Sequence, residues 1–220
     1  MKNTFAIFDM DGTLVDSMGY WNRLADEYLN KHGIPPLSPA LKEESIALTM
    51  LESAQLFIRE FGLPGTPQDI ASEINALMEE HYRSHVLLKP GASDLLRRMK
   101  QAGFQLCVAS STHPALIDLC LRRLGVRDCF SFLLSCEEVG VGKNRPDVYL
   151  EAARRLGGTP ENTVVFEDIL VAAQTAKKAG FSLCVIYDVN SDGEQNQLQA
   201  LADCYITRWD DPALSDWLYL

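Results

Sequence analysis

Short apolar runs alternate with stretches of helical periodicity along most of the chain. Continuous apolar runs of this length are typical of strands buried on both faces of a parallel sheet. The runs that predict strands are Thr4–Phe8, Phe104–Ala109, Phe130–Leu134, Thr163–Phe166, Ser182–Tyr187 and Cys204–Ile206. The helices predicted between them are Ala92–Ala102, Pro114–Leu124, Pro146–Leu156, Ile169–Ala179 and Glu194–Leu201. This alternation predicts an α/β fold with right-handed crossovers and a doubly wound, Rossmann-like parallel sheet.

One long stretch breaks the alternation directly after the first predicted strand. Between residues 18 and 85 the apolar positions recur only at helical spacing. The pattern predicts one helix around Trp21–Leu29 that ends before Gly33, a second over Glu44–Phe61 and a third over Gln68–Ser84. We therefore expect an α/β core domain of residues 1–17 and 86–220 and an inserted helical cap domain of residues 18–85.

Composition narrows the class of protein. The chain has 220 residues, of which 47% are apolar and 23% charged, as in an ordinary globular protein with a buried core. The apolar runs are too short to cross a membrane, and the N-terminus does not resemble a signal peptide. The net charge of −10, without a Lys/Arg cluster, argues against a nucleic-acid partner.

The six cysteines are scattered and contain no C-x-x-C pair. This pattern favours a reducing setting over a disulfide framework, so we expect a cytoplasmic protein. A monomer is the default expectation.

Polar side chains follow three of the predicted strands at the point where each strand ends. These residues are Asp9 and Asp11 after the first strand, Ser110, Ser111 and Thr112 after the second, and Glu167 and Asp168 after the strand Thr163–Phe166. Lys143 lies in a glycine-containing loop before a predicted helix. Because parallel sheets bind ligands beyond the carboxyl ends of their strands, we expect these groups to converge in one crevice.

The charges in this set call for compensation. Four carboxylates that lie close together cannot all stay ionised in a partly buried site. A divalent cation together with Lys143 would leave a single net negative charge. Because hard oxygen ligands favour Mg²⁺, we expect a magnesium site at these strand ends.

The same residues suit phosphoryl transfer. An aspartate can attack phosphorus and form an aspartyl phosphate, and the position of Asp9 suits this role. Asp11, across a tight turn, can first protonate the leaving oxygen and then activate a water. Ser110 can donate a hydrogen bond to a phosphoryl oxygen, and Lys143 can supply a positive charge to the phosphate.

At this point the chain resembles the haloacid dehalogenase superfamily. Phe8–Ser17 resembles its first motif, D-x-D-G-T-[LV], and Ser110 resembles the second. Lys143–Tyr149 resembles the third motif, and Glu167–Asp168 the fourth. The four motifs occur in the family's order over nearly the whole chain, and the helical insertion resembles the C1 cap of β-phosphoglucomutases and phosphoglycolate phosphatases.

The resemblance implies a Mg²⁺-dependent phosphatase that hydrolyses a small phosphorylated metabolite. It implies that Asp9, the backbone carbonyl of Asp11 and Asp168 bind the metal, with Glu167 supporting them. The presence of Asp11 implies phosphoryl transfer rather than dehalogenation, because the true dehalogenases lack an acid/base at this position. It leaves the substrate open, and candidate contacts in the cap are Trp21, Arg23, Thr49, Glu52 and Arg83.

Several positions depart from the family's pattern. Ile169 stands where the fourth motif usually has a small residue, Ala172 stands where it usually has a glycine, and Asn144 replaces a proline of the third motif. Trp21 stands where β-phosphoglucomutases have a histidine, and residues 46–52 lack those enzymes' cap arginine. These differences favour a phosphatase over the alternative, a β-phosphoglucomutase-like sugar-phosphate mutase.

Two further classes fit the sequence less well. A signalling receiver domain is disfavoured by the insertion and by the place of Asp9 after the first strand, and a catalytically inactive phosphoryl-binding module by the complete set of polar residues. Local roles are also predicted: Thr112 as the cap of the following helix, Trp21 as part of the cap's packing, and Arg145 as a surface ion pair.

Overall fold

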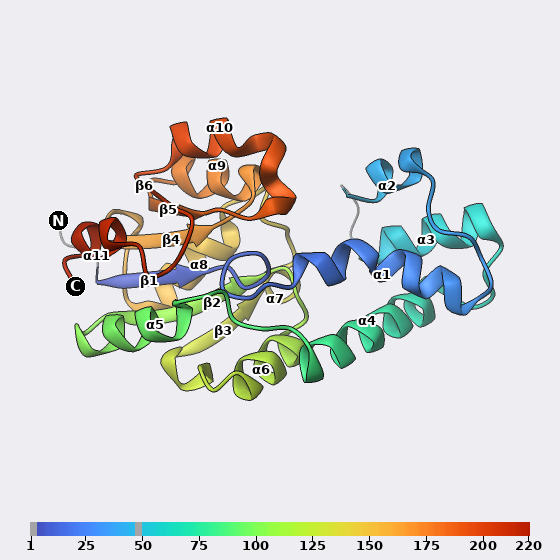
Figure 1. Cartoon of the computed structure of the whole chain (residues 1–220), viewed down its shortest axis with the longest axis horizontal. Coiled ribbons are helices and arrows are strands. Elements are labelled where there is room, and N and C mark those ends of the chain that lie inside the picture. The colour runs from blue at the N-terminus through green and yellow to red at the C-terminus, as the bar shows by residue number, and fades with distance from the viewer. Residues whose placement is uncertain (1–3, 47–49) are drawn as a thin grey trace. The chain divides into compact units, whose positions relative to one another are not determined.

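The computed structural model describes residues 4–46 and 50–220 and contains two compact units. The first, the core unit, consists of Met1–Ser17 with Val86–Leu220. The second, the helical unit, consists of Met18–His85 (Figure 1).

The core unit is built on a six-stranded, fully parallel sheet. Its strands are β1 (Phe5–Phe8), β2 (Gln105–Ser110), β3 (Phe132–Ser135), β4 (Thr163–Glu167), β5 (Ser182–Ile186) and β6 (Cys204–Ile206). The strand order is β3-β2-β1-β4-β5-β6, so β1 lies between β2 and β4. The predicted α/β fold with a parallel sheet is confirmed. All six predicted strands are present, with ends shifted by a few residues.

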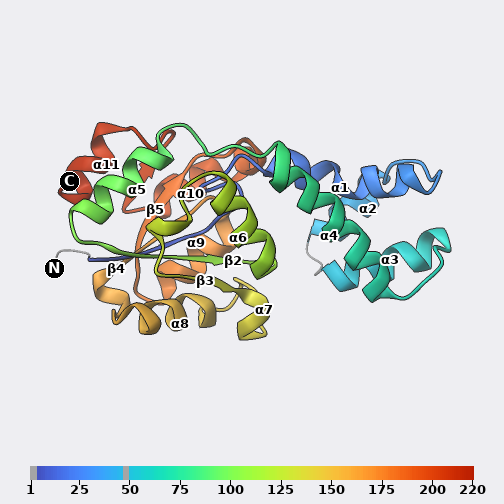
Figure 2. The same cartoon turned by 90° about the horizontal axis from the view of Figure 1, so that it is seen from below.

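Helices cover both faces of this sheet. They are α5 (Ala92–Gln101), α6 (Pro114–Arg123), α7 (Cys136–Val139), α8 (Asp147–Leu156), α9 (Leu170–Lys178), α10 (Gln195–Leu201) and α11 (Pro212–Leu218). Figure 2 shows α8 on one side of the sheet and α5 and α11 on the other. The helices α7 and α11 were not predicted: α7 has only four residues, and in α11 the helical spacing of the buried Leu214 and Leu218 spans a single turn.

The core follows the alternation of side chains along the buried strands. Ile7 on β1 belongs to an apolar cluster that includes Val148 of α8. The next residue, Phe8, stacks on Phe166 of β4 at 4.3 Å between ring centroids and also contacts Trp209. Because both faces of β1 are buried in this way, the strand is apolar throughout, as its sequence predicts.

The helical unit contains α1 (Met18–Lys31), α2 (Pro39–Ile46), α3 (Met50–Phe61) and α4 (Pro67–Ser84). The predicted start of a helix at Glu44 is wrong, because α2 already begins at Pro39; residues 47–49 lie outside the described part of the chain. Trp21 on α1 donates a hydrogen bond to the hydroxyl of Tyr82 on α4, at 3.0 Å, so its indole takes part in packing within this unit. In the described residues we find no helix both long and apolar enough to span a bilayer.

Candidate active site

Five predicted site residues lie at the carboxyl ends of the strands or in a neighbouring loop. Asp9 follows β1, Ser110 ends β2, Glu167 ends β4 and Asp168 follows it. Lys143 lies between α7 and α8. All five side chains belong to buried residues, the most exposed being Lys143 at 7%. These polar groups are therefore held in the protein interior at one edge of the sheet, where water does not solvate them fully.

A tight turn follows Asp9 and positions Asp11. Gly12 has φ near +80°, a conformation that side chains disfavour, and its amide donates to the carbonyl of Val15 at 3.0 Å. Asp11 then accepts hydrogen bonds on both carboxylate oxygens, from Ser17 Oγ at 2.5 Å and from Thr112 Oγ1 at 2.6 Å. The carboxylate of Asp11 is thus held by hydroxyl groups from two different loops.

The predicted capping role of Thr112 is wrong. The N-cap of α6 is His113, whose Nδ1 accepts from the amide of Ala115 at 3.3 Å. Thr112 stands one residue before this N-cap. It is buried and donates its hydroxyl hydrogen to Asp11 Oδ2, a carboxylate acceptor that makes a strong hydrogen bond.

Three carboxylates form the acidic centre of the site, and we call them the acidic triad. Oxygens of Asp9, Glu167 and Asp168 all lie within 4.8 Å of one another. Lys143 Nζ donates to Asp9 Oδ1 and, at 2.6 Å, to Glu167 Oε1. The carboxylate of Asp11 is not a member of this triad.

Burial and mutual repulsion disfavour negative charge on the acidic triad. Burial raises the pKa of Asp9 to about 7, against the attraction of Lys143 and with the repulsion of Glu167. Burial, then Asp9 and Glu167, raise the pKa of Asp168 well above its usual range. Burial alone would lower the pKa of Lys143, but the two carboxylates beside it raise the pKa instead. Lys143 therefore stays charged, and a further cation would stabilise the ionised triad.

The triad fits a divalent metal ion. Glu167 Oε2 and Asp168 Oδ2 are buried and, among the described residues, find no hydrogen-bond partner. A buried polar group without a partner costs about 1–3 kcal/mol, so such atoms call for an explanation. A set made only of carboxylate oxygens suits a hard cation such as Mg²⁺, and such an ion would provide the partner that these two oxygens lack among the described residues.

The chain also matches a known protein family. Residues 5–180 match the sequence profile of the haloacid dehalogenase-like hydrolases. The chain belongs to the haloacid dehalogenase-like hydrolase family. The predictions of the family and of a hydrolase enzyme are thereby confirmed.

Similar proteins include several phosphatases. A probable pseudouridine-5'-phosphatase of Drosophila melanogaster is 28% identical, with 98% of this chain and 97% of that protein covered. The bifunctional riboflavin kinase/FMN phosphatase of Arabidopsis thaliana is 27% identical over 96% of this chain, but the chain spans only 57% of its length. The structure of CbbY from Rhodobacter sphaeroides in complex with phosphate is 26% identical, with a TM-score of 0.82, and covers 95% of this chain and 96% of CbbY.

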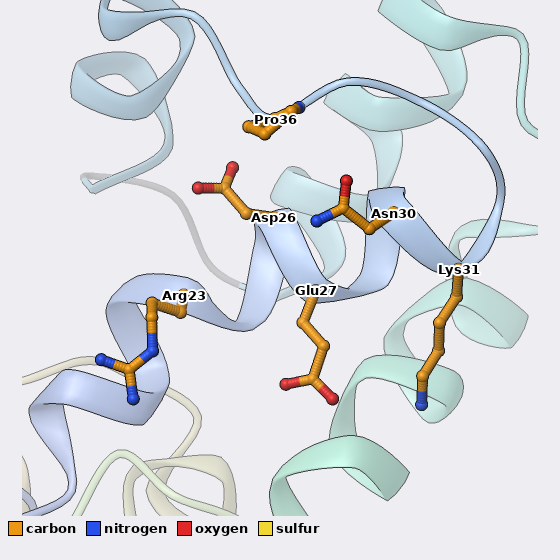
Figure 3. Close-up of a pocket in the computed structure, with 6 residues that line it drawn as sticks. All are labelled: Arg23, Asp26, Glu27, Asn30, Lys31 and Pro36. Atoms are coloured by element: carbon orange, nitrogen blue, oxygen red, sulfur yellow. The ribbon is translucent and has the colours of Figure 1, made fainter.

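An open hollow of about 640 Å³ lies in the helical unit itself. Its lining consists of Arg23, Asp26, Glu27, Asn30, Lys31 and Pro36 (Figure 3). Figure 3 shows Asp26 and Asn30 extending toward the loop that carries Pro36, and Asp26 accepts a hydrogen bond from the amide of Leu37 at 2.8 Å. Of the candidate substrate contacts predicted for the cap, Arg23 lines this hollow, whereas Thr49 lies outside the described residues.

Three further residues singled out in the sequence lie in or beside the site motifs, and the structure shows their local surroundings. Arg145 forms the expected surface ion pair, with Asp147 at 3.3 Å. Ile169, which stands where the fourth motif usually has a small residue, is the N-cap of α9 and provides no side-chain hydrogen bond there. Ala172 is fully buried on α9, so a methyl group is accommodated at that position.

Sequence reasoning missed two side chains that bind the acidic triad. Thr13 Oγ1 donates to Asp168 Oδ1 at 2.7 Å, and Tyr149 donates to Glu167 Oε1, also at 2.7 Å. Both residues stand inside the quoted motifs. Their place inside these motifs marks both residues as candidates for the site, but it does not identify the carboxylate to which each one donates.

Proposed function

We propose that the chain is a Mg²⁺-dependent phosphatase that hydrolyses a small phosphorylated metabolite through an aspartyl phosphate on Asp9. The observation that carries the proposal is the acidic triad with Lys143 bound to Asp9, buried at the carboxyl end of the sheet. The family and the phosphatases among the similar proteins support it. Phosphate esters of small molecules are the substrate class that their names share.

Asp9, Asp168 and Glu167 are the side chains that would hold the metal, together with the backbone carbonyl of Asp11 that the family resemblance implies. Two of these side chains present the buried oxygens that have no donor among the residues the structure describes, Glu167 Oε2 and Asp168 Oδ2. When bound, Mg²⁺ supplies positive charge that orients a phosphoryl group and offsets its negative charge.

Asp9 provides the nucleophile. One of its carboxylate oxygens forms a bond to phosphorus while the bond between phosphorus and the ester oxygen breaks. Lys143 lies against Asp9 Oδ1 and holds the carboxylate in one orientation. Its fixed ammonium charge also stabilises the phosphoryl oxygens as negative charge shifts between them.

Asp11 moves the protons in this scheme. It protonates the leaving oxygen in the first step. In the second step it takes a proton from the water that attacks phosphorus, while the bond between phosphorus and Asp9 breaks and releases phosphate. The hydroxyls of Ser17 and Thr112 bind one carboxylate oxygen of Asp11 each and so hold the group in a fixed position for these transfers. Ser110 Oγ accepts from the amide of Thr112 at 3.1 Å, and its own hydrogen is available for a phosphoryl oxygen.

A mutase is the less favoured function. At the position where β-phosphoglucomutases have a histidine, Trp21 donates its only polar hydrogen to Tyr82 within the helical unit. An indole cannot accept a hydrogen bond or exchange a proton as a histidine does. This substitution supports hydrolysis over return of the phosphoryl group to a sugar.

The test is release of inorganic phosphate from sugar phosphates, nucleotides and small acid phosphates, with Mg²⁺ and with EDTA. We expect turnover only with Mg²⁺, and we expect Asp9→Asn to abolish it because an amide does not attack phosphorus. Asp94→Asn is the matched control, since that side chain is 83% exposed on α5 of the same unit. Turnover by Asp9→Asn at the wild-type rate would exclude Asp9 as the nucleophile.

A further inference from the structure

The carboxylate of Glu167 is asymmetric in its surroundings. Its Oε1 accepts two hydrogen bonds, from Lys143 Nζ at 2.6 Å and from Tyr149 Oη at 2.7 Å. Its Oε2 is buried and has no hydrogen-bond partner among residues 4–46 and 50–220. The residue as a whole has no exposed surface. Oε1 therefore has its full set of hydrogen bonds, whereas Oε2 is left for a group that is not part of the described chain.

Tyr149 is held firmly where it donates. It lies in the first turn of α8, is fully buried, and packs edge-on against Phe181 at 6.2 Å between ring centroids. The Lys143 ammonium lies 5.9 Å from the centre of the same ring. Burial and the Glu167 carboxylate raise the pKa of the Tyr149 hydroxyl, so this group remains a donor throughout the physiological pH range.

This arrangement limits how Glu167 can bind a metal. A carboxylate oxygen has about two lone-pair positions, and both on Oε1 are taken by donors. Coordination through both oxygens would require at least one of these hydrogen bonds to break. Mg²⁺ prefers six single oxygen ligands in a near-ideal octahedron, whereas Ca²⁺ takes six to eight ligands and commonly includes a bidentate carboxylate.

We propose that Tyr149, together with Lys143, restricts Glu167 to one coordinating oxygen and thereby makes the acidic triad selective for Mg²⁺ over Ca²⁺. This inference rests on the proposed function, because it assigns selectivity to the same metal site. Tyr149 acts through Glu167 and is a positioning residue.

The test uses Tyr149→Phe in the full chain, with Mg²⁺ and Ca²⁺ each titrated separately by calorimetry. The variant removes one hydroxyl and keeps the ring. It frees one lone pair of Oε1, so Glu167 can turn toward bidentate coordination. Loss of groups that orient metal ligands typically costs 10–100-fold in affinity. We expect Mg²⁺ affinity to fall by about tenfold, and the preference for Mg²⁺ over Ca²⁺ to fall by a similar factor.

Tyr28→Phe is the matched control. Tyr28 is buried on α1 and donates to Glu73 Oε2 at 2.8 Å, so it also is a tyrosine–glutamate pair, but both of its members belong to the helical unit. This variant should keep the wild-type ratio of the two affinities. A general loss of packing would affect both variants, whereas altered selectivity should appear only in Tyr149→Phe.

The outcomes separate this inference from the proposed function. If the wild-type chain does not bind Mg²⁺, the proposed function fails. If the wild-type chain binds Mg²⁺ and the affinity ratio in Tyr149→Phe is unchanged, the role of Tyr149 is refuted. Should Tyr149→Phe not fold, a crystal structure of the wild-type chain with Ca²⁺ decides: coordination through Oε2 alone supports the inference, and bidentate Glu167 overturns it.

Discussion

Among the acidic residues of the site, Asp11 has different surroundings from the acidic triad. Hydroxyls of Ser17 and Thr112 bind its two oxygens, whereas one oxygen each of Glu167 and Asp168 has no donor in the described part of the chain. Like residues can take different roles when their environments differ. The contrast separates the proposed proton carrier from the proposed metal ligands.

This separation predicts the behaviour of Asp11→Asn. The amide cannot carry a proton between solvent and the leaving oxygen, so kcat should fall by roughly 10²-fold or more. Affinity for Mg²⁺ should stay close to that of the wild type, because the side chain is not part of the triad. Steady-state kinetics and calorimetric titration measure the two effects separately, with Asp9→Asn as the variant expected to impair both. Complete loss of Mg²⁺ binding in Asp11→Asn would identify this side chain as a ligand.

At the residue scale, the sequence predicted where a polar side chain lies better than which group it binds. Asp9, Glu167 and Asp168 could be assigned to one crevice because each comes at the end of a predicted strand. The bond from Tyr149 to Glu167 depends on how α8 docks against the sheet, and no local pattern encodes that docking. The error about Thr112 has a similar cause, since its acceptor, Asp11, is distant in the sequence.

At the element scale, the long elements were predictable and the short ones were not. Strand β1 and helix α4 have clear apolar patterns because tertiary packing buries a whole face or both faces. Helix α7 has four residues and starts with a capping box between Ser135 and Glu138, whereas α11 starts at Asp211 and Pro212. Those starts rest on hydrogen bonds to a few backbone amides, and the helices behind them are short: α7 is a single turn, and α11 has one buried apolar pair at helical spacing, Leu214 and Leu218.

Helix α4 offers a direct test of such a start signal. Thr66 accepts from the amide of Asp69 at 3.2 Å, and Asp69 Oδ2 accepts from the amide of Thr66 at 2.9 Å. Thr66 is exposed, so Thr66→Ala removes the cap with little loss of packing. We expect unfolding free energy to fall by about 1 kcal/mol, and Thr66→Ser to retain most of it. Urea denaturation measures the change, and equal stability of the alanine and serine variants would show that the side-chain bond contributes nothing.

At the scale of the whole sheet, the strand order explains where the site lies. The chain builds β1, β2 and β3 on one side of the sheet and then places β4 on the other side of β1. In doubly wound sheets ligands bind at such a reversal, beyond the carboxyl ends of the strands. Asp9 after β1 and Glu167 at the end of β4 flank that reversal. The alternation of strands and helices predicts the class of sheet but not this order, which depends on long-range pairing.

The buried charges at this reversal also couple folding to pH and to metal. The pKa of Asp9 is raised from 3.8 to about 7, and that of Asp168 is raised as well. A raised pKa means that the folded chain holds the proton more tightly than the unfolded chain does. The resulting stabilisation is complete below the unfolded pKa of 3.8 and is lost as pH rises through about 7. The metal-free protein should therefore lose stability from this cause across that interval.

Magnesium should reverse the loss, because it binds the ionised carboxylates and competes with their protons. We expect millimolar Mg²⁺ to raise Tm more at about pH 8 than at about pH 5, where the triad already holds protons. Thermal unfolding at the two pH values, with Mg²⁺ or with EDTA, measures this difference. Asp168→Asn should lessen the difference, since it removes one of the ionising ligands. A Tm that responds to Mg²⁺ equally at both pH values would mean that the ion binds somewhere other than the triad.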